Sequence, residues 1–178
     1  MSSIIWVFGA SSALLYGTMA YIMLTANADG SPLYTLDVDL SWTVENAAER
    51  LGAMGVEGRR AYARFNLVDL LFPIAGFGPL LYLLLSRAYP ASSVWVFGVL
   101  AAVLDVLENA VIYCLLSATR AVDLGFASSA AEAFEPSVYN LWAHGHWCSI
   151  LKFLCLGLAI GALVLNWCVW TSKVLKTH

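Results

Sequence analysis

The stretch LDVLENA, residues 104–110, places two acids and an amide inside the apolar run AAVLDVLENAVIYCLL, residues 101–116. Successive residues of a helix are rotated by about 100°, so positions i, i+3 and i+4 share one face. Asp105, Glu108 and Asn109 are therefore predicted to point together. A charge at the centre of a membrane helix costs about 2.5–3.5 kcal/mol on insertion scales, so this face is expected to point away from lipid.

The whole chain has the composition of a membrane protein. Of its 178 residues, 61% are hydrophobic and 12% are charged, and the charged share of soluble domains is about 25%. A membrane helix needs about 20 consecutive apolar residues, and the segments that satisfy this requirement lie at about 4–25, 65–86, 93–117 and 141–170. The sequence thus predicts an all-α protein, a polytopic membrane four-helix bundle formed by residues 1–178 as a single transmembrane domain.

The loop at about 27–64 is predicted to contain a short amphipathic helix, within SWTVENAAERLGAMG. Such a helix lies on the membrane surface, against a partner or over its own bundle, and the last arrangement is favoured. Its apolar stripe is predicted to consist of Trp42, Val44, Ala48, Leu51 and Met54.

Interfacial positions are predicted for Trp42 and for three arginines. Arg59, Arg60 and Arg64 precede the second span, where long cationic side chains reach the lipid headgroups. Within that span, Pro73 and Pro79 predict a bend, which membrane helices tolerate when neighbours satisfy the freed carbonyl groups.

Small residues recur at intervals of four in two of the spans. The first span contains Gly9, Ala13 and Gly17, and the fourth contains Gly157 and Gly161. This spacing lets membrane helices approach one another closely. The sequence leaves open whether the contact is made within this chain or with another subunit.

Polar residues of three spans are predicted to meet inside the protein. Two loops, at about 27–64 and 118–137, are predicted to lie on the same side of the membrane. At about 1.5 Å per residue, the charged residues of these spans all lie in the half of the bilayer nearer these loops. Lys152 is expected to pair with Glu108 and with Asp105 or Asp69. The complete predicted network is Asn66, Asp69, Asp105, Glu108, Asn109, His144 and Lys152.

This network has two interpretations. Buried ionic clusters fix helix register and partner choice, whereas a protonatable acid inside a membrane indicates the handling of protons, ions or a substrate. Because three acids face one lysine, at least one acid is expected to be protonated at neutral pH, unless Arg64 or water reaches the network.

No cofactor, metal ion or nucleic-acid partner is expected. His144 and His146 point nearly opposite ways on a helix, so one face does not offer both to a single ion. The cysteines fall within predicted spans without C-x-x-C spacing and are expected to behave as small apolar residues. The sequence contains no familiar catalytic motif, which argues against an enzyme.

The segments GRRAYARFNLVDLLFP (58–73) and LDVLENA, together with Lys152 in SILKFL, resemble a pattern of uncharacterised small four-helix integral membrane proteins. In that pattern an Arg-Tyr entry precedes a D-x-x-F-P span, and a D-x-x-E-N span follows. The resemblance covers about residues 58–153 and implies no known activity.

The first functional hypothesis is an integral membrane accessory or scaffold subunit, held together by a buried acid–lysine network. Its partners would be the lipid bilayer and other membrane protein subunits. A bioenergetic complex is the hypothetical setting, with the mitochondrial inner membrane as one candidate. The alternatives are a small proton- or ion-coupled transporter and a membrane-embedded lipid-modifying enzyme.

Overall fold

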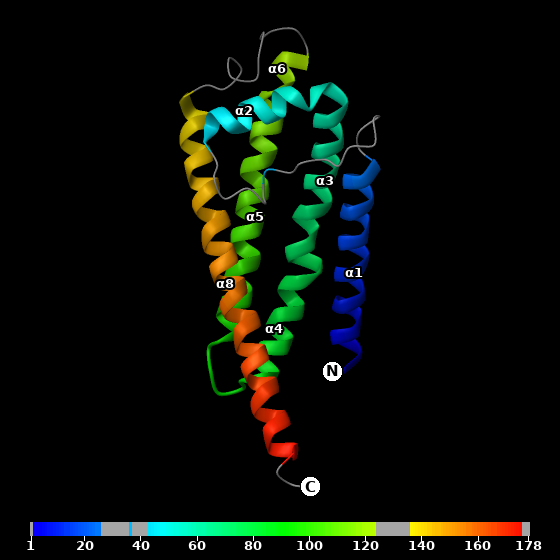
Figure 1. Ribbon diagram of the computed structural model, residues 1–178, viewed down its shortest axis with the longest axis vertical. Coiled ribbons are helices and arrows are strands. Elements are labelled where there is room, and N and C mark those ends of the chain that lie inside the picture. The colour runs from blue at the N-terminus through cyan, green and yellow to red at the C-terminus, as the bar shows by residue number, and fades with distance from the viewer. Residues whose placement is uncertain (1, 26–35, 37–42, 124–135, 176–178) are drawn as a thin grey trace.

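The computed structural model describes residues 2–25, 36, 43–123 and 136–175. Within these ranges all regular structure is helical, so the predicted all-α class is confirmed for the described part of the chain (Figure 1). The helices are α1 (Ser2–Thr25), α2 (Val44–Ala53), α3 (Gly55–Ala75), α4 (Phe77–Ala88), α5 (Trp95–Ala118), α6 (Arg120–Asp123) and α8 (Pro136–Leu175).

Four helical stretches are long and apolar enough to cross a membrane, namely Ser3–Thr25, Gly55–Ala88, Trp95–Ala118 and Ala143–Ser172. They overlap the four predicted spans. The prediction of a loop up to residue 64 was wrong, because α3 already begins at Gly55, directly after α2. Gly55 has a φ of 62°, a left-handed conformation that costs glycine little and turns the chain from α2 into α3.

The bend predicted from the prolines of the second span is present as a break between α3 and α4. Pro73 lies inside α3, and Gly76 separates the two helices with φ −117° and ψ −106°. Gly78 fits tightly on the inside of this bend, since a Cβ atom there would lie 2.2 Å from the Pro73 carbonyl oxygen and 2.8 Å from Ala102 Cβ. The break therefore brings α4 against α5.

The long helices pack in sequence from one side of the molecule to the other (Figure 1). The helix α1 packs against α3 and α4, these two pack against α5, and α5 packs against α8. The helix α1 is barely buried, with 6% of its most apolar window inside the protein. The described contacts thus place α1 at an edge, and the predicted four-helix bundle stays a prediction.

The helix α2 is the short amphipathic helix that the sequence predicts. Thr43 caps it by accepting a hydrogen bond from the Asn46 backbone N–H. Its buried residues Ala47, Ala48 and Leu51 share one core with residues of α1, α3 and α5. The helix therefore packs over its own protein, as favoured from the sequence, while Trp42 lies outside the described residues.

The helix α8 extends past the turn between α4 and α5. The Tyr89 hydroxyl in this turn donates to the Ala162 carbonyl at 2.6 Å, yet α8 continues to Leu175. At about 1.5 Å per residue, roughly 20 Å of α8 lies beyond that contact. Trp167 and Trp170 are exposed on this part, with their ring centroids 5.8 Å apart.

Candidate functional site: a buried acid–lysine cluster

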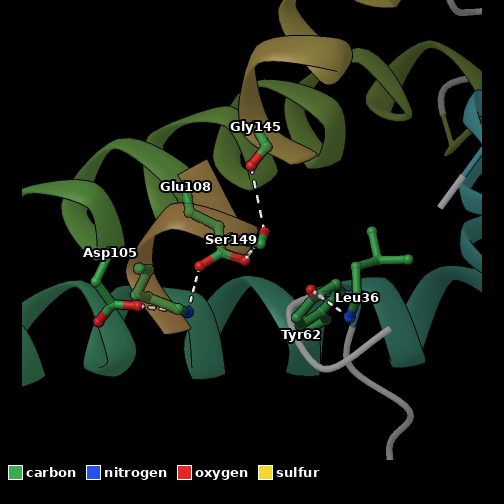
Figure 2. A network of polar contacts seen from close by, with 7 residues as sticks. Leu36, Tyr62, Asp105, Glu108, Gly145 and Ser149 are labelled. Atoms are coloured by element: carbon green, nitrogen blue, oxygen red, sulfur yellow. Dashed lines mark hydrogen bonds and ion pairs between the residues drawn. The ribbon is translucent and has the colours of Figure 1, made fainter. Parts of the chain in front are cut away.

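Lys152 binds two carboxylates of α5 in the interior of the protein. Its Nζ donates to Asp105 Oδ1 at 2.7 Å and also contacts Glu108 Oε2. The Ser149 hydroxyl donates to the other oxygen of Glu108, and Figure 2 shows Asp105, Glu108 and Ser149 turned toward one another. These four residues, named the acid–lysine cluster below, are all buried, with exposed fractions of 7% or less.

Helix geometry explains why these residues meet. Asp105 and Glu108 are three apart on α5, and Ser149 and Lys152 are three apart on α8, so each pair shares a face. The two helices run antiparallel, and Asp105 is level with Lys152 as Glu108 is level with Ser149. Spacing on both helices thus allows one lysine to reach both acids, as expected from the sequence.

The cluster is stabilising only as a complete set. Taking charges out of water is costly, and their mutual attraction compensates for this only with good hydrogen bonding. Both oxygens of Glu108 are bonded, one to Ser149 and one to Lys152. Removing one partner of a buried pair costs about 3–5 kcal/mol because the other charge is left uncompensated. The cluster therefore strongly favours one register of α5 against α8.

The amide residues of the predicted network lie between α3 and α5. Asn66 Nδ2 donates to the Asn109 carbonyl oxygen at 3.0 Å. Both asparagines are buried, as is Asp69, one turn further along α3. The structure thus buries six of the seven predicted network residues.

His144 is the exception, and its predicted burial was wrong. Its side chain is exposed, and Nδ1 lies 2.8 Å from the Asn140 carbonyl oxygen, one turn earlier on α8. The face of α8 that meets α5 carries Gly145, Ser149 and Lys152. His144 is rotated by about 100° from Gly145, so it leaves this face.

Arg59 also lies elsewhere than predicted. Its side chain is buried rather than interfacial, with Nη1 donating to the Leu51 carbonyl at 2.8 Å and Nη2 paired with Asp123. It therefore ties α3 to the end of α2 and to α6. Arg60 and Arg64 are exposed, and their position at the lipid headgroups stays a prediction. Sequence reasoning missed the role of Arg59 because Asp123 is remote in the chain.

The four glycines predicted to mediate helix packing make no close approach to the described residues of this chain. A Cβ atom built on Gly9, Gly17, Gly157 or Gly161 would meet no atom within 4 Å. The intrachain form of that prediction was therefore wrong, and contact with another subunit stays a prediction. Close approaches occur instead at Gly76, Gly78, Gly98 and Gly145.

An apolar groove of about 590 Å³ lies between the α3–α4 bend and α5. Most of its α5 residues lie on the side of that helix away from Glu108, by the 100° rotation per residue. It is therefore separate from the acid–lysine cluster. Its lining residues are Pro73, Ile74, Gly78, Pro79, Tyr82, Val99, Ala102, Val103, Val106 and Leu107.

Within the described residues, no group of three or more histidine, cysteine, aspartate or glutamate side chains is arranged to hold a metal ion. Comparison with protein-family models, curated proteins and solved structures finds no match to this chain. The resemblance to small four-helix membrane proteins thus stays a prediction.

Proposed function

We propose that this chain is an integral membrane accessory or scaffold subunit, whose acid–lysine cluster fixes α5 against α8. The observation that carries the proposal is the pairing of Lys152 with both Asp105 and Glu108 at matched levels of two helices. Sliding α5 along α8 by one turn would leave buried charges unpaired, so this cluster makes other registers of the two helices less stable. We expect a partner subunit to pack against a pair of helices whose relative position is fixed in this way.

The helix α1 supports a role among other membrane subunits. Gly9, Ala13 and Gly17 follow one another at intervals of four along it. Neither glycine has an atom within 4 Å of its Cβ position, and Ala13 is exposed. Because small residues let helices approach closely in lipid, this side of α1 suits a helix from another subunit.

Photo-crosslinking in native membranes tests this proposal. A photoreactive residue at Ala13 on α1 is compared with one at Ala110, an exposed alanine on α5. We expect Ala13 to give one discrete protein adduct heavier than the 19.3 kDa chain, and Ala110 to give none. Lipid adducts alone at both positions, with one chain per particle after mild extraction, would contradict an accessory subunit.

A small proton- or ion-coupled transporter is a second candidate, favoured by one observation. Three acids, Asp69, Asp105 and Glu108, are buried on α3 and α5, and Lys152 on α8 pairs with two of them. Proteoliposomes with a pH-sensitive dye inside test this candidate. An ion-dependent pH change that Glu108→Gln abolishes would support transport, and unchanged internal pH in the presence of each alkali cation would reject it.

A further inference from the structure

The apolar groove between the α3–α4 bend and α5 lies within the predicted membrane region. All of its lining residues belong to Gly55–Ala88 and Trp95–Ala118, two stretches that are long and apolar enough to cross a membrane. One end of the groove lies at Pro73 on α3, and the other lies at Tyr82 on α4, nearer the turn between α4 and α5. In a bilayer the groove therefore opens toward the hydrocarbon of the surrounding lipids.

The lining of the groove suits an apolar occupant. None of its described lining residues is charged, and the Tyr82 hydroxyl is the one polar side-chain group among them. Gly78 and Ala102 form the floor, since a Cβ atom built on the glycine would lie 2.8 Å from Ala102 Cβ. Ile74 and Val103 are exposed along the walls. A hydrocarbon chain fills such a space without burying a polar group that lacks a hydrogen bond.

The length of the groove matches the depth of one leaflet. Trp95 precedes Val99 by four residues and therefore shares the face of α5 that lines the groove. From Trp95 to Leu107 this helix rises about 18 Å, and half of a typical hydrocarbon core is about 15 Å thick. A lipid chain that enters beside Trp95 and follows α5 to Leu107 thus reaches the middle of the membrane.

The groove is too small for a helix of another subunit. An α-helix is about 10 Å wide, so the 12 Å or so from Val99 to Leu107 would hold a helical segment of roughly 900 Å³. The volume of the groove is about 590 Å³. An extended hydrocarbon chain is much thinner than a helix, so it fits between α4 and α5.

Aromatic and cationic residues mark the end of the groove nearest the turn. The rings of Tyr82 and Trp95 lie edge to face, with their centroids 5.6 Å apart. Tyrosine and tryptophan are enriched where the hydrocarbon meets the headgroups. Arg87 is exposed in the last turn of α4, about 7 Å further toward the turn than Tyr82. A phosphate group above this end of the groove is therefore at a depth where a cation lies.

We infer that the groove binds one acyl chain of a phospholipid from the leaflet around the α4–α5 turn. The chain lies between α4 and α5, with its tail beside Pro73 and Leu107 and its headgroup beyond Trp95. It provides the lining side chains with packing partners that an unfilled groove lacks. The inference goes beyond the scaffold role, because binding of this lipid requires no partner subunit.

Retention of lipid during detergent extraction distinguishes a bound phospholipid from the lipids that surround any membrane protein. The full-length chain is reconstituted in dioleoyl phosphatidylcholine liposomes, extracted in a mild detergent and washed until free lipid is removed. Native mass spectrometry then counts the phospholipid molecules on each chain. We expect one phospholipid to remain on most chains.

Two matched variants locate the retained phospholipid. Val103→Trp fills the groove from its wall, where Val103 is 49% exposed. Val164→Trp makes the same change on α8, at a valine that is 54% exposed and does not line the groove. We expect Val103→Trp to lower the retained fraction by about tenfold, and Val164→Trp to leave it unchanged.

Labelling with photo-leucine locates the lipid without a bulky substitution, so the test stays decisive should Val103→Trp fail to fold. Leu107 lines the groove, and Leu151 is similarly exposed on α8 outside it. The pairing of Asp105 with Lys152 places these two leucines at similar depth. On irradiation of the washed protein, we expect phospholipid adducts at Leu107 and detergent adducts at Leu151.

Each of four results would overturn the inference. These are the absence of retained phospholipid, retention that Val103→Trp does not lower, equal phospholipid labelling of Leu107 and Leu151, and a protein adduct at Leu107 in native membranes. The last result would assign the groove to a side chain of another subunit or of a second copy. None of the first three affects the crosslinking at Ala13, so failure of the lipid site is distinguishable from failure of the scaffold role.

Discussion

Gly145 lies against Val111, so closely that a Cβ atom built on the glycine would come within 2.8 Å of Val111 Cγ1. The contact lies one turn of α8 before Ser149, which reaches Glu108 on α5. Helix proximity at Gly145 thus allows a side chain as short as serine to join the acid–lysine cluster. Packing and ion pairing are two aspects of the same interface between α5 and α8.

Gly145→Ala tests this proximity. The added methyl group overpacks the contact with Val111, and overpacking typically costs about 1–3 kcal/mol. Gly157→Ala is the control on the same helix, because nothing lies within 4 Å of its Cβ position; there the better helix propensity of alanine is expected to leave stability equal or slightly higher. Unfolding free energies in nanodiscs provide the measurement, and equal values for the two variants would contradict the close contact.

Lys152→Met is expected to cost about 3–5 kcal/mol of unfolding free energy, because it leaves Asp105 and Glu108 buried without their cation. Neutralising the whole set, with Asp105→Asn and Glu108→Gln added to Lys152→Met, is expected to recover most of this loss. Buried ion pairs replaced as a unit are often neutral in stability. A triple variant as unstable as Lys152→Met would show that the pairing does not explain the cost.

Ser149→Ala removes the hydroxyl that donates to Glu108. Hydrogen bonds to charged groups contribute about 1.5–3 kcal/mol, so a loss in that range is expected. Ser172→Ala, at an exposed serine bonded only within its own helix turn, is expected to change stability by less than about 0.5 kcal/mol. The same unfolding assay compares the two, and similar small effects would indicate that Glu108 does not depend on Ser149.

Arg59→Met and Arg60→Met compare the contribution to stability of a buried arginine, Arg59, with that of an exposed one, Arg60. Arg59 binds the Leu51 carbonyl and Asp123, so its replacement leaves a buried acceptor unpaired, at a cost of about 1–3 kcal/mol. Arg60 pairs with Glu57 at the surface with its side chain 66% exposed, and such pairs contribute about 0–1 kcal/mol. Chemical unfolding followed by tryptophan fluorescence measures both, and a larger loss for Arg60→Met would refute this assignment.

The sequence predicts the helices and the core of the acid–lysine cluster for definable reasons. Hydropathy identifies membrane-length helices directly. The expected partners of Lys152 follow from two facts, namely the spacing of Asp105 and Glu108 and their similar depth to the lysine. The spacing belongs to one helix, and the depth of each residue follows from counting along its own span, so both facts are readable from one sequence.

Features that depend on helix rotation or on remote segments were harder to predict. The sequence placed His144 on the same face of the fourth span as Lys152, whereas the observed contact face carries Gly145, Ser149 and Lys152. His144 and Gly145 are neighbours in the chain, so the two faces differ by about one residue of rotation. Gly145 and Ser149, small residues four apart, were the available signal. The role of Arg59 needed knowledge of Asp123, which lies 64 residues away.

The extension of α8 beyond the α4–α5 turn has a consequence for the surrounding lipid. The apolar stretch Ala143–Ser172 contains 30 residues, about 45 Å of helix, and a typical hydrocarbon core is about 30 Å thick. Such a mismatch is relieved by tilting the helix or by thickening the bilayer locally. Since α8 is joined to α5 through Lys152, the two helices tilt together, and the stability of this protein is expected to change with the acyl-chain length of its membrane.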